Sequence, residues 1–165
     1  MTKEIFTCFL GISICIVSSA QNYKYKPENS VILDSSQGKG LLVQCSRRTP
    51  QHITGLFNLD TGHIKKLENN FKKIFQKKDR SCCVRGFAVS NLKDYAFQYT
   101  GIIIHRTKYI YINAFRLPSQ LQAVNFFESW KTEPVMVCDG GDDFWGVLFN
   151  LKTETFSQLA FNGEG

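Results

Sequence analysis

The residues best suited to chemistry lie in one short acidic segment near the end of the chain. Asp139, Asp142 and Asp143 surround two glycines and are followed at once by Phe144 and Trp145. Crowded carboxylates on a loop can bind Ca²⁺, and a pair of them can act as general acid and base when their pKa values differ. However, the spacing is not that of the twelve-residue calcium loop, and the sequence places no second carboxylate opposite this one. We therefore expect a tight glycine turn, with contact to a partner as the main functional alternative.

Nucleophilic catalysis finds little support among the other reactive side chains. The histidines are His52, His63 and His105; His63 falls at the start of an expected helix and His105 in an expected hairpin turn, and both positions usually face water. The sequence contains no G-x-S-x-G, P-loop or H-E-x-x-H motif. We therefore expect no catalytic residue, cofactor or bound metal. The enzymatic alternative is a small hydrolase or lyase with an acidic site around residues 139–143.

Four cysteines follow the first twenty residues: Cys45, Cys82, Cys83 and Cys138. An even number favours two disulfides in an exported protein, whereas a zinc site needs ligands paired at short spacing. A bond between adjacent cysteines closes a small, strained ring. We therefore predict that Cys45 and Cys138 each pair with one of the two adjacent cysteines. A Cys45–Cys138 bridge beside a vicinal pair is the alternative.

The first twenty residues have the layout of a secretory signal peptide. A polar start with one lysine precedes an apolar run over residues 5–17, and small residues over 18–20 lead to a cleavage point near Ala20. The apolar run is too short to span a bilayer comfortably, and no second long apolar run follows. We expect a secreted or periplasmic protein without a transmembrane segment, folded where thiols oxidise.

One helix and two hairpins are the elements that must position the candidate residues. Apolar residues recur at helical spacing over 63–78, and Asp60 or Thr61 can cap the start of this helix. A second helix is expected over 120–131. Alternating patterns predict five strands, of which the first two and the last two form hairpins: 96–104, 108–115, 134–138, 144–151 and 155–161.

The remaining organisation is simple. Residues 21–40 read as an irregular lead-in, and residues 41–165 read as a single domain that is long enough to bury its own core. The order of elements predicts an α+β fold of two layers, with one or two helices packed on an antiparallel meander sheet.

The net charge of +6 is concentrated in the expected helix. Four of its lysines, Lys65, Lys66, Lys72 and Lys73, fall opposite the apolar stripe. Such a face is either solvated or attracts an anionic partner. No aromatic residues interleave with the lysines, so we expect no nucleic-acid partner.

Two further patterns resemble a known group of proteins. Val-Cys-Asp-Gly-Gly-Asp followed by Phe-Trp-Gly-Val over 137–147, and Tyr-Ile-Tyr-Ile-Asn-Ala-Phe over 109–115, are similar to those of small exported bacterial proteins without an assigned role. The resemblance implies a bacterial source and a complete domain, and it implies no catalytic residue.

Taken together, these features predict a secreted or periplasmic, non-catalytic binding protein, such as an inhibitor or accessory factor. Its partner would be a protein or another extracytoplasmic macromolecule. The main candidate surface is the turn over 139–143 with a partly exposed Trp145 beside it. The second is the lysine face, which in an alternative function attaches the protein to an anionic surface.

Overall fold

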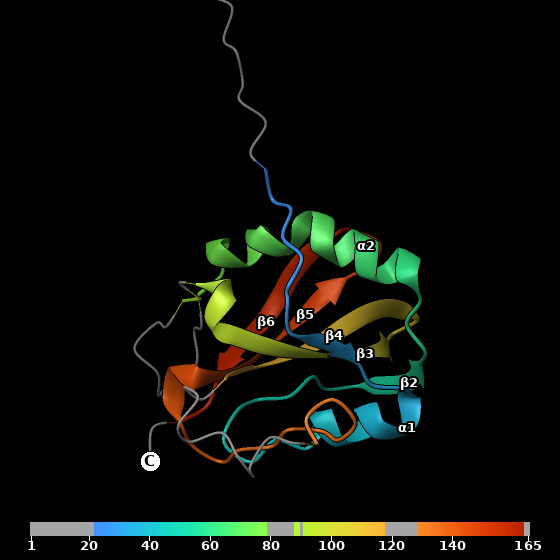
Figure 1. Ribbon diagram of the computed structural model, residues 1–165. Helices are drawn as coiled ribbons and strands as arrows, with labels where there is room; N and C mark the ends of the chain where they lie inside the picture. The colour runs from blue at the N-terminus through green and yellow to red at the C-terminus, as the bar shows by residue number, and fades with distance from the viewer. Residues whose placement is uncertain (1–21, 79–87, 90, 118–128, 164–165) are drawn as a thin grey trace, which may run out of the picture.

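The computed structural model describes residues 22–78, 88–89, 91–117 and 129–163. These residues form a six-stranded mixed sheet with helical segments on both faces (Figure 1). The strand order is β1-β3-β4-β5-β6, and β2 also pairs with β3. The predicted α+β class with a strand meander is confirmed. The elements are β1 (Ser30–Ile32), α1 (Ser35–Gly38), η1 (Lys39–Leu42), β2 (Ile53–Phe57), α2 (Thr61–Asn70), η2 (Phe71–Gln76), η3 (Leu92–Asp94), β3 (Tyr95–Ile104), β4 (Thr107–Arg116), η4 (Gly141–Asp143), β5 (Phe144–Asn150) and β6 (Thr155–Phe161).

The sheet contains the two predicted hairpins. β3 and β4 pair without interruption from Tyr95–Arg116 to Ile104–Thr107. His105 and Arg106 form the turn between them, with φ angles of 47° and 66°. A two-residue turn of this kind requires positive φ at both positions, because its twist must match that of the strands. β5 and β6 form the second hairpin, which pairs with β4.

The outer edge of β3 is shared by two short strands. β1 runs parallel to its first half, at Phe97–Tyr99, and β2 runs antiparallel to its second half, at Gly101–Ile104. The lead-in expected to be irregular therefore contains β1 and, directly after it, α1. Asp34 caps α1 through a capping box with Gln37, so this part of the chain has a local reason for its structure.

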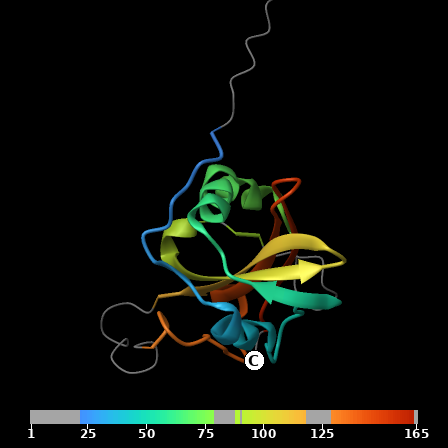
Figure 2. The same ribbon diagram turned by 90° about the vertical axis from the view of Figure 1, so that its right-hand side faces the viewer.

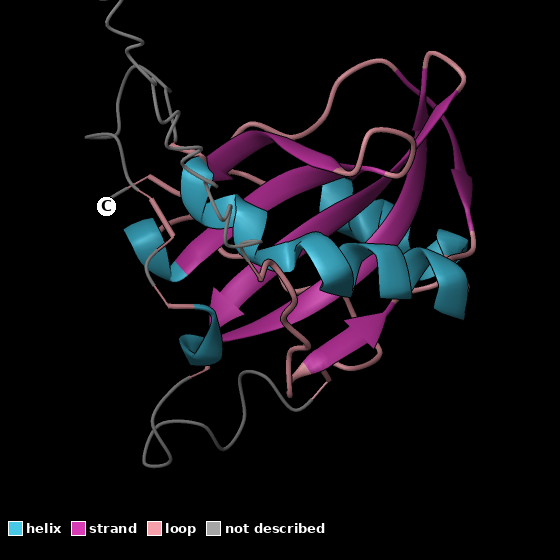
Figure 3. Cartoon of the chain, turned by 90° about the horizontal axis from the view of Figure 1, so that it is seen from above, coloured by secondary structure: helices cyan, strands magenta, loops and turns pink. Residues whose placement is uncertain are grey.

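One face of the sheet is covered by α2 and η2 (Figure 3). Leu67, Phe71 and Ile74 are fully buried against it. Asp60 caps α2, as predicted: its carboxylate accepts a hydrogen bond of 2.8 Å from the backbone N–H of His63, and this bond lowers the pKa of Asp60. The expected helix continues to residue 76, but its last six residues have 3-10 geometry.

The opposite face carries a smaller apolar cluster beneath α1 and η1, which contains Leu33, Leu41, Ile102, Tyr111 and Leu148. Residues 133–140 cross this face without forming a strand, so the strand predicted over 134–138 is wrong. Instead, side-chain amides form hydrogen bonds with the backbone carbonyls of this segment. Asn113 donates 3.0 Å to the carbonyl of Val135, and Asn162 donates 2.7 Å to that of Val137.

Cys45 and Cys138 form a disulfide, with their Cα atoms 5.0 Å apart. The favoured prediction, in which each pairs with Cys82 or Cys83, is therefore wrong, and the alternative bridge is the one found. The reason is topological: Cys45 follows η1 and Cys138 lies in the crossing segment, and both pass over the same face of the sheet. Cys82 and Cys83 lie outside the described residues, as do the expected signal peptide and residues 120–128 of the expected second helix.

Within the described ranges, the chain has no helix of the length and apolarity needed to cross a membrane.

Candidate functional site

The acidic segment is a glycine turn whose charge is partly neutralised within the protein. Gly140 and Gly141 have φ angles of 96° and 53°, which favour glycine. The carboxylate of Asp143 accepts a hydrogen bond from Arg116, which raises the pKa of Arg116. Asp139 and Asp142 are exposed, and the backbone carbonyl of Asp142 accepts 2.9 Å from the hydroxyl of Tyr95. The turn thus fastens the end of β4 through Arg116, which also lies 3.5 Å from the carboxylate of Asp94.

Trp145 is fully buried, so the prediction that it is partly exposed beside the turn is wrong. It lies on β5 and its ring packs edge-on against Tyr95 at 5.5 Å and Phe97 at 5.9 Å. Residues 147 and 149 share its face of the strand and are buried in the same cluster. The acidic turn therefore lacks the exposed tryptophan that made it the main candidate.

The histidines have local structural contacts. His63 belongs to the capping box of α2, and the rings of His52 and His105 stack at 5.6 Å on exposed turns. In the part of the chain that the structure describes, no three His, Cys, Asp or Glu side chains are grouped closely enough to hold a metal ion.

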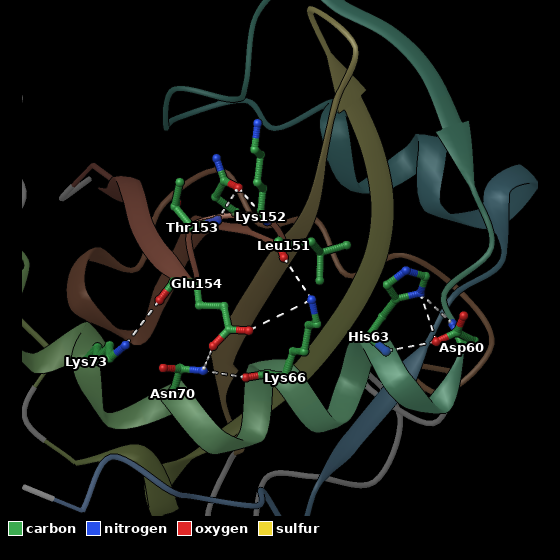
Figure 4. Close-up of polar contacts among 10 residues, drawn as sticks. Asp60, His63, Lys66, Asn70, Lys73, Leu151, Lys152, Thr153 and Glu154 are labelled. Carbon is green, nitrogen blue, oxygen red and sulfur yellow. Dashed lines mark hydrogen bonds and ion pairs between the residues drawn. The ribbon is translucent and has the colours of Figure 1, made fainter. Parts of the chain in front are cut away.

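The four candidate lysines do not form one face. Lys66 and Lys73 reach from the helix to the β5–β6 turn (Figure 4): Lys66 Nζ donates 3.3 Å to the carbonyl of Leu151, and Lys73 Nζ donates 3.4 Å to that of Glu154. The Glu154 carboxylate also accepts 3.0 Å from Asn70 and lies 3.9 Å from Lys66. These contacts hold the hairpin against α2, so Lys66 and Lys73 are engaged within the protein.

Lys65 points instead to an open groove of about 420 Å³ between α2 and β1. Lys24 and Lys26 line it from the N-terminal segment, while Ile32 and Ile64 contribute apolar side chains to its lining. Ile32 is 42% exposed, so it adds accessible apolar surface to the groove. The groove therefore combines three ammonium groups with an apolar surface.

The wall of this groove is fixed by backbone hydrogen bonds. Tyr25 N–H donates 2.9 Å to the carbonyl of Glu68, and Lys72 N–H donates 2.9 Å to that of Tyr23. Figure 2 shows the N-terminal segment, in blue, descending beside α2 towards β1. Lys72 thus joins helix and wall through its backbone, and its side chain is half-buried. The sequence does not predict Lys24, Lys26 or Ile32 as candidate residues, because their segment shows no periodic pattern.

A second basic pocket, of about 280 Å³, lies where the ends of the two hairpins meet. Its cations are Arg106, Lys108 and Lys152, and the ammonium of Lys108 lies 4.8 Å from the centre of the Phe57 ring. The amide N–H of Leu151 donates 3.1 Å to the carbonyl of Lys108, which holds the two hairpin ends together. This pocket is smaller than the groove.

No protein-family model matches the sequence, and neither the curated proteins nor the solved structures contain a match to it.

Proposed function

We propose that this is a secreted or periplasmic, non-catalytic binding protein whose groove between α2 and β1 takes an acidic segment of a partner protein. One observation carries the proposal: Lys24, Lys26 and Lys65 line the same groove as the exposed Ile32 and as Ile64. Surfaces that bind another macromolecule combine an apolar core with a polar rim. The signal-peptide pattern of residues 1–20 and the Cys45–Cys138 disulfide support the location.

The charge of the groove selects the kind of partner. Its lining holds three lysines and a single carboxylate, that of Glu68. A partner with several carboxylates is attracted, and a basic one is repelled. The second basic pocket adds to the long-range attraction, but its lining contains a single apolar residue, Leu151.

Charge reversal tests the groove as the binding surface. The probe is a fluorescent ten-residue peptide of alternating glutamate and threonine, followed by fluorescence anisotropy at low ionic strength. The double variant Lys26→Glu/Lys65→Glu is expected to weaken binding about tenfold, because two attractions become repulsions at the rim of a partly desolvated groove. A peptide of alternating lysine and threonine is expected to bind the same variant better than the parent protein.

The matched control changes the net charge equally at the other basic pocket. Arg106→Glu/Lys152→Glu is expected to weaken binding of the acidic peptide less than threefold, through long-range attraction only. Equal losses in the two double variants would show that the peptide responds to net charge alone. A loss confined to the Arg106/Lys152 variant would move the binding surface to the second pocket. Either result overturns the proposal.

A further inference from the structure

The free edge of β1 forms one border of the groove, and its backbone groups point outward in a defined pattern. Phe97 N–H donates 2.9 Å to the carbonyl of Asn29, and Leu33 N–H donates 2.9 Å to that of Tyr99. In a parallel pair, alternate residues direct both their N–H and C=O towards the neighbouring strand. Asn29, Val31 and Leu33 therefore face β3, so Ser30 and Ile32 direct their backbone groups away from the sheet.

This outward edge is unpaired among the described residues. β1 is the first strand in the order of the sheet, and its sole partner there is β3. An edge strand with free N–H and C=O groups is a template on which another strand can add. The three-residue length of β1 limits such pairing to a short stretch, so side-chain contacts must contribute as well.

The groove provides those side-chain contacts on one side of the added strand. Ile32 lines the groove together with Thr61, Ile64 and Lys65 of α2, so its side chain lies on the α2 side of the sheet. A strand added at this edge would place every second side chain on that side. Acidic side chains at these positions would meet the lysines, and their methylene groups would cover Ile32.

We infer that the partner segment binds as an extended strand added to β1, with acidic residues alternating along it. This inference rests on the proposed function and deepens it, because it assigns the backbone conformation of the ligand. The lysine rim alone would accept an acidic segment in any conformation, helical or irregular. Strand addition requires that backbone N–H groups of the ligand reach the carbonyls of Ser30 and Ile32.

N-methylation of the peptide tests this requirement directly. Two versions of the alternating glutamate–threonine peptide are compared, one methylated on the glutamate nitrogens and one on the threonine nitrogens. In an added strand, one set of N–H groups faces β1 and the other faces solvent, so one version is expected to lose at least tenfold in affinity and the other to keep most of it. Loss in the glutamate version indicates an antiparallel strand, because directly paired residues then share a side of the sheet. Loss in the threonine version indicates a parallel strand.

The two proposals fail in different ways. If the charge-reversal variant loses affinity but both methylated peptides bind like the parent peptide, the groove is the site and strand addition is wrong. Equal losses with both methylated peptides also overturn strand addition, because methylation then acts on the peptide's own conformation. Nuclear magnetic resonance supplies a second readout: the amide signals of Ser30 and Ile32 are expected to shift on binding more than those of Asn29 and Val31, and equal shifts would contradict strand pairing.

Discussion

Replacing Asn162 by alanine is expected to destabilise the protein by about 3–5 kcal/mol, more than replacing Arg47 itself. Asn162 and Arg47 are both buried, with Arg47 only 8% exposed. Arg47 Nη1 donates 2.8 Å to the side-chain oxygen of Asn162, and Nη2 donates to that of Asn113. Among the described residues no carboxylate forms an ion pair with Arg47. The two amide oxygens are thus the main compensation for a buried positive charge.

Asn162→Ala is expected to destabilise more than Arg47→Met because of the buried polar groups that each substitution leaves without partners. Asn162→Ala keeps the buried guanidinium and removes one of its two acceptors. It also frees the carbonyls of Val137 and Asp139, to which the amide of Asn162 donates at 2.7 and 2.9 Å. Arg47→Met leaves two amide oxygens without a donor but removes the charge, whose burial is itself unfavourable, so its net cost is about 1–3 kcal/mol.

Urea denaturation of the disulfide-intact variants measures these differences. The double variant Arg47→Met/Asn162→Ala is expected to be less destabilised than the sum of the single changes, because Arg47→Met removes the buried charge that Asn162→Ala deprives of an acceptor. Asn69→Ala, at an exposed position of α2, is the matched control and should change the free energy of unfolding by less than about 0.5 kcal/mol. A loss of under 1 kcal/mol for Asn162→Ala, or a greater loss for Arg47→Met, would contradict this account.

The same polar network explains why one prediction from sequence failed. Residues 134–138 include three valines or methionines in an extended stretch, which favours a strand by composition. The backbone of this segment is bonded by side chains that a local pattern cannot reveal: Gln98 accepts 2.9 Å from the N–H of Val135, and Asn113 donates to its carbonyl. Gln98 and Asn113 come from the middle of β3 and β4, far away in the sequence.

The alternating patterns of β4 and β5 also indicate which side chains of each strand lie on the same face of the sheet. Tyr111 and Asn113 alternate with apolar residues, which suggests a solvated face, yet both are buried because α1, η1 and the crossing segment cover that face. Trp145 shares its side of β5 with Val147 and Phe149, so period two alone places it in the core. Its position next to an exposed turn was the misleading signal.

The two hairpins and α2 have a local cause and were predicted, whereas α1 was missed despite its local capping box, and β1 depends on distant pairing. Both hairpins have alternating strands joined by short turns, and the start of α2 has a capping residue at Asp60. By contrast, β1 is three residues long and exists through its parallel register with β3. The groove was equally hard to predict from sequence. Periodicity places Lys65 on an exposed helical face, but Lys24 and Ile32 come to face it only through long-range packing.

Removing the Cys45–Cys138 disulfide is the second change with a large expected effect. The bridge joins residues separated by 93 positions. In the chain-entropy description, a closed loop of this size lowers the entropy of the unfolded chain enough to stabilise the native state by about 4–5 kcal/mol. Cys45→Ala/Cys138→Ala is expected to lose about 3–5 kcal/mol in urea denaturation, since local strain and residual structure reduce the ideal value.

The loss should also be visible locally, because the disulfide and Asn162 hold the same segment. The amide of Asn162 binds the carbonyls on either side of Cys138, so the crossing segment is attached to the sheet at consecutive residues. Without the disulfide, we expect proteolysis within residues 133–140 to become faster than cleavage elsewhere in the described core, because the segment retains only hydrogen bonds that can open locally.

Mass spectrometry of a non-reducing digest provides the control: the parent protein should yield a peptide pair linked through Cys45 and Cys138. A pair that links Cys45 to Cys82 or Cys83 would contradict the bridge, and unchanged stability of the double variant would contradict its role in closing the chain.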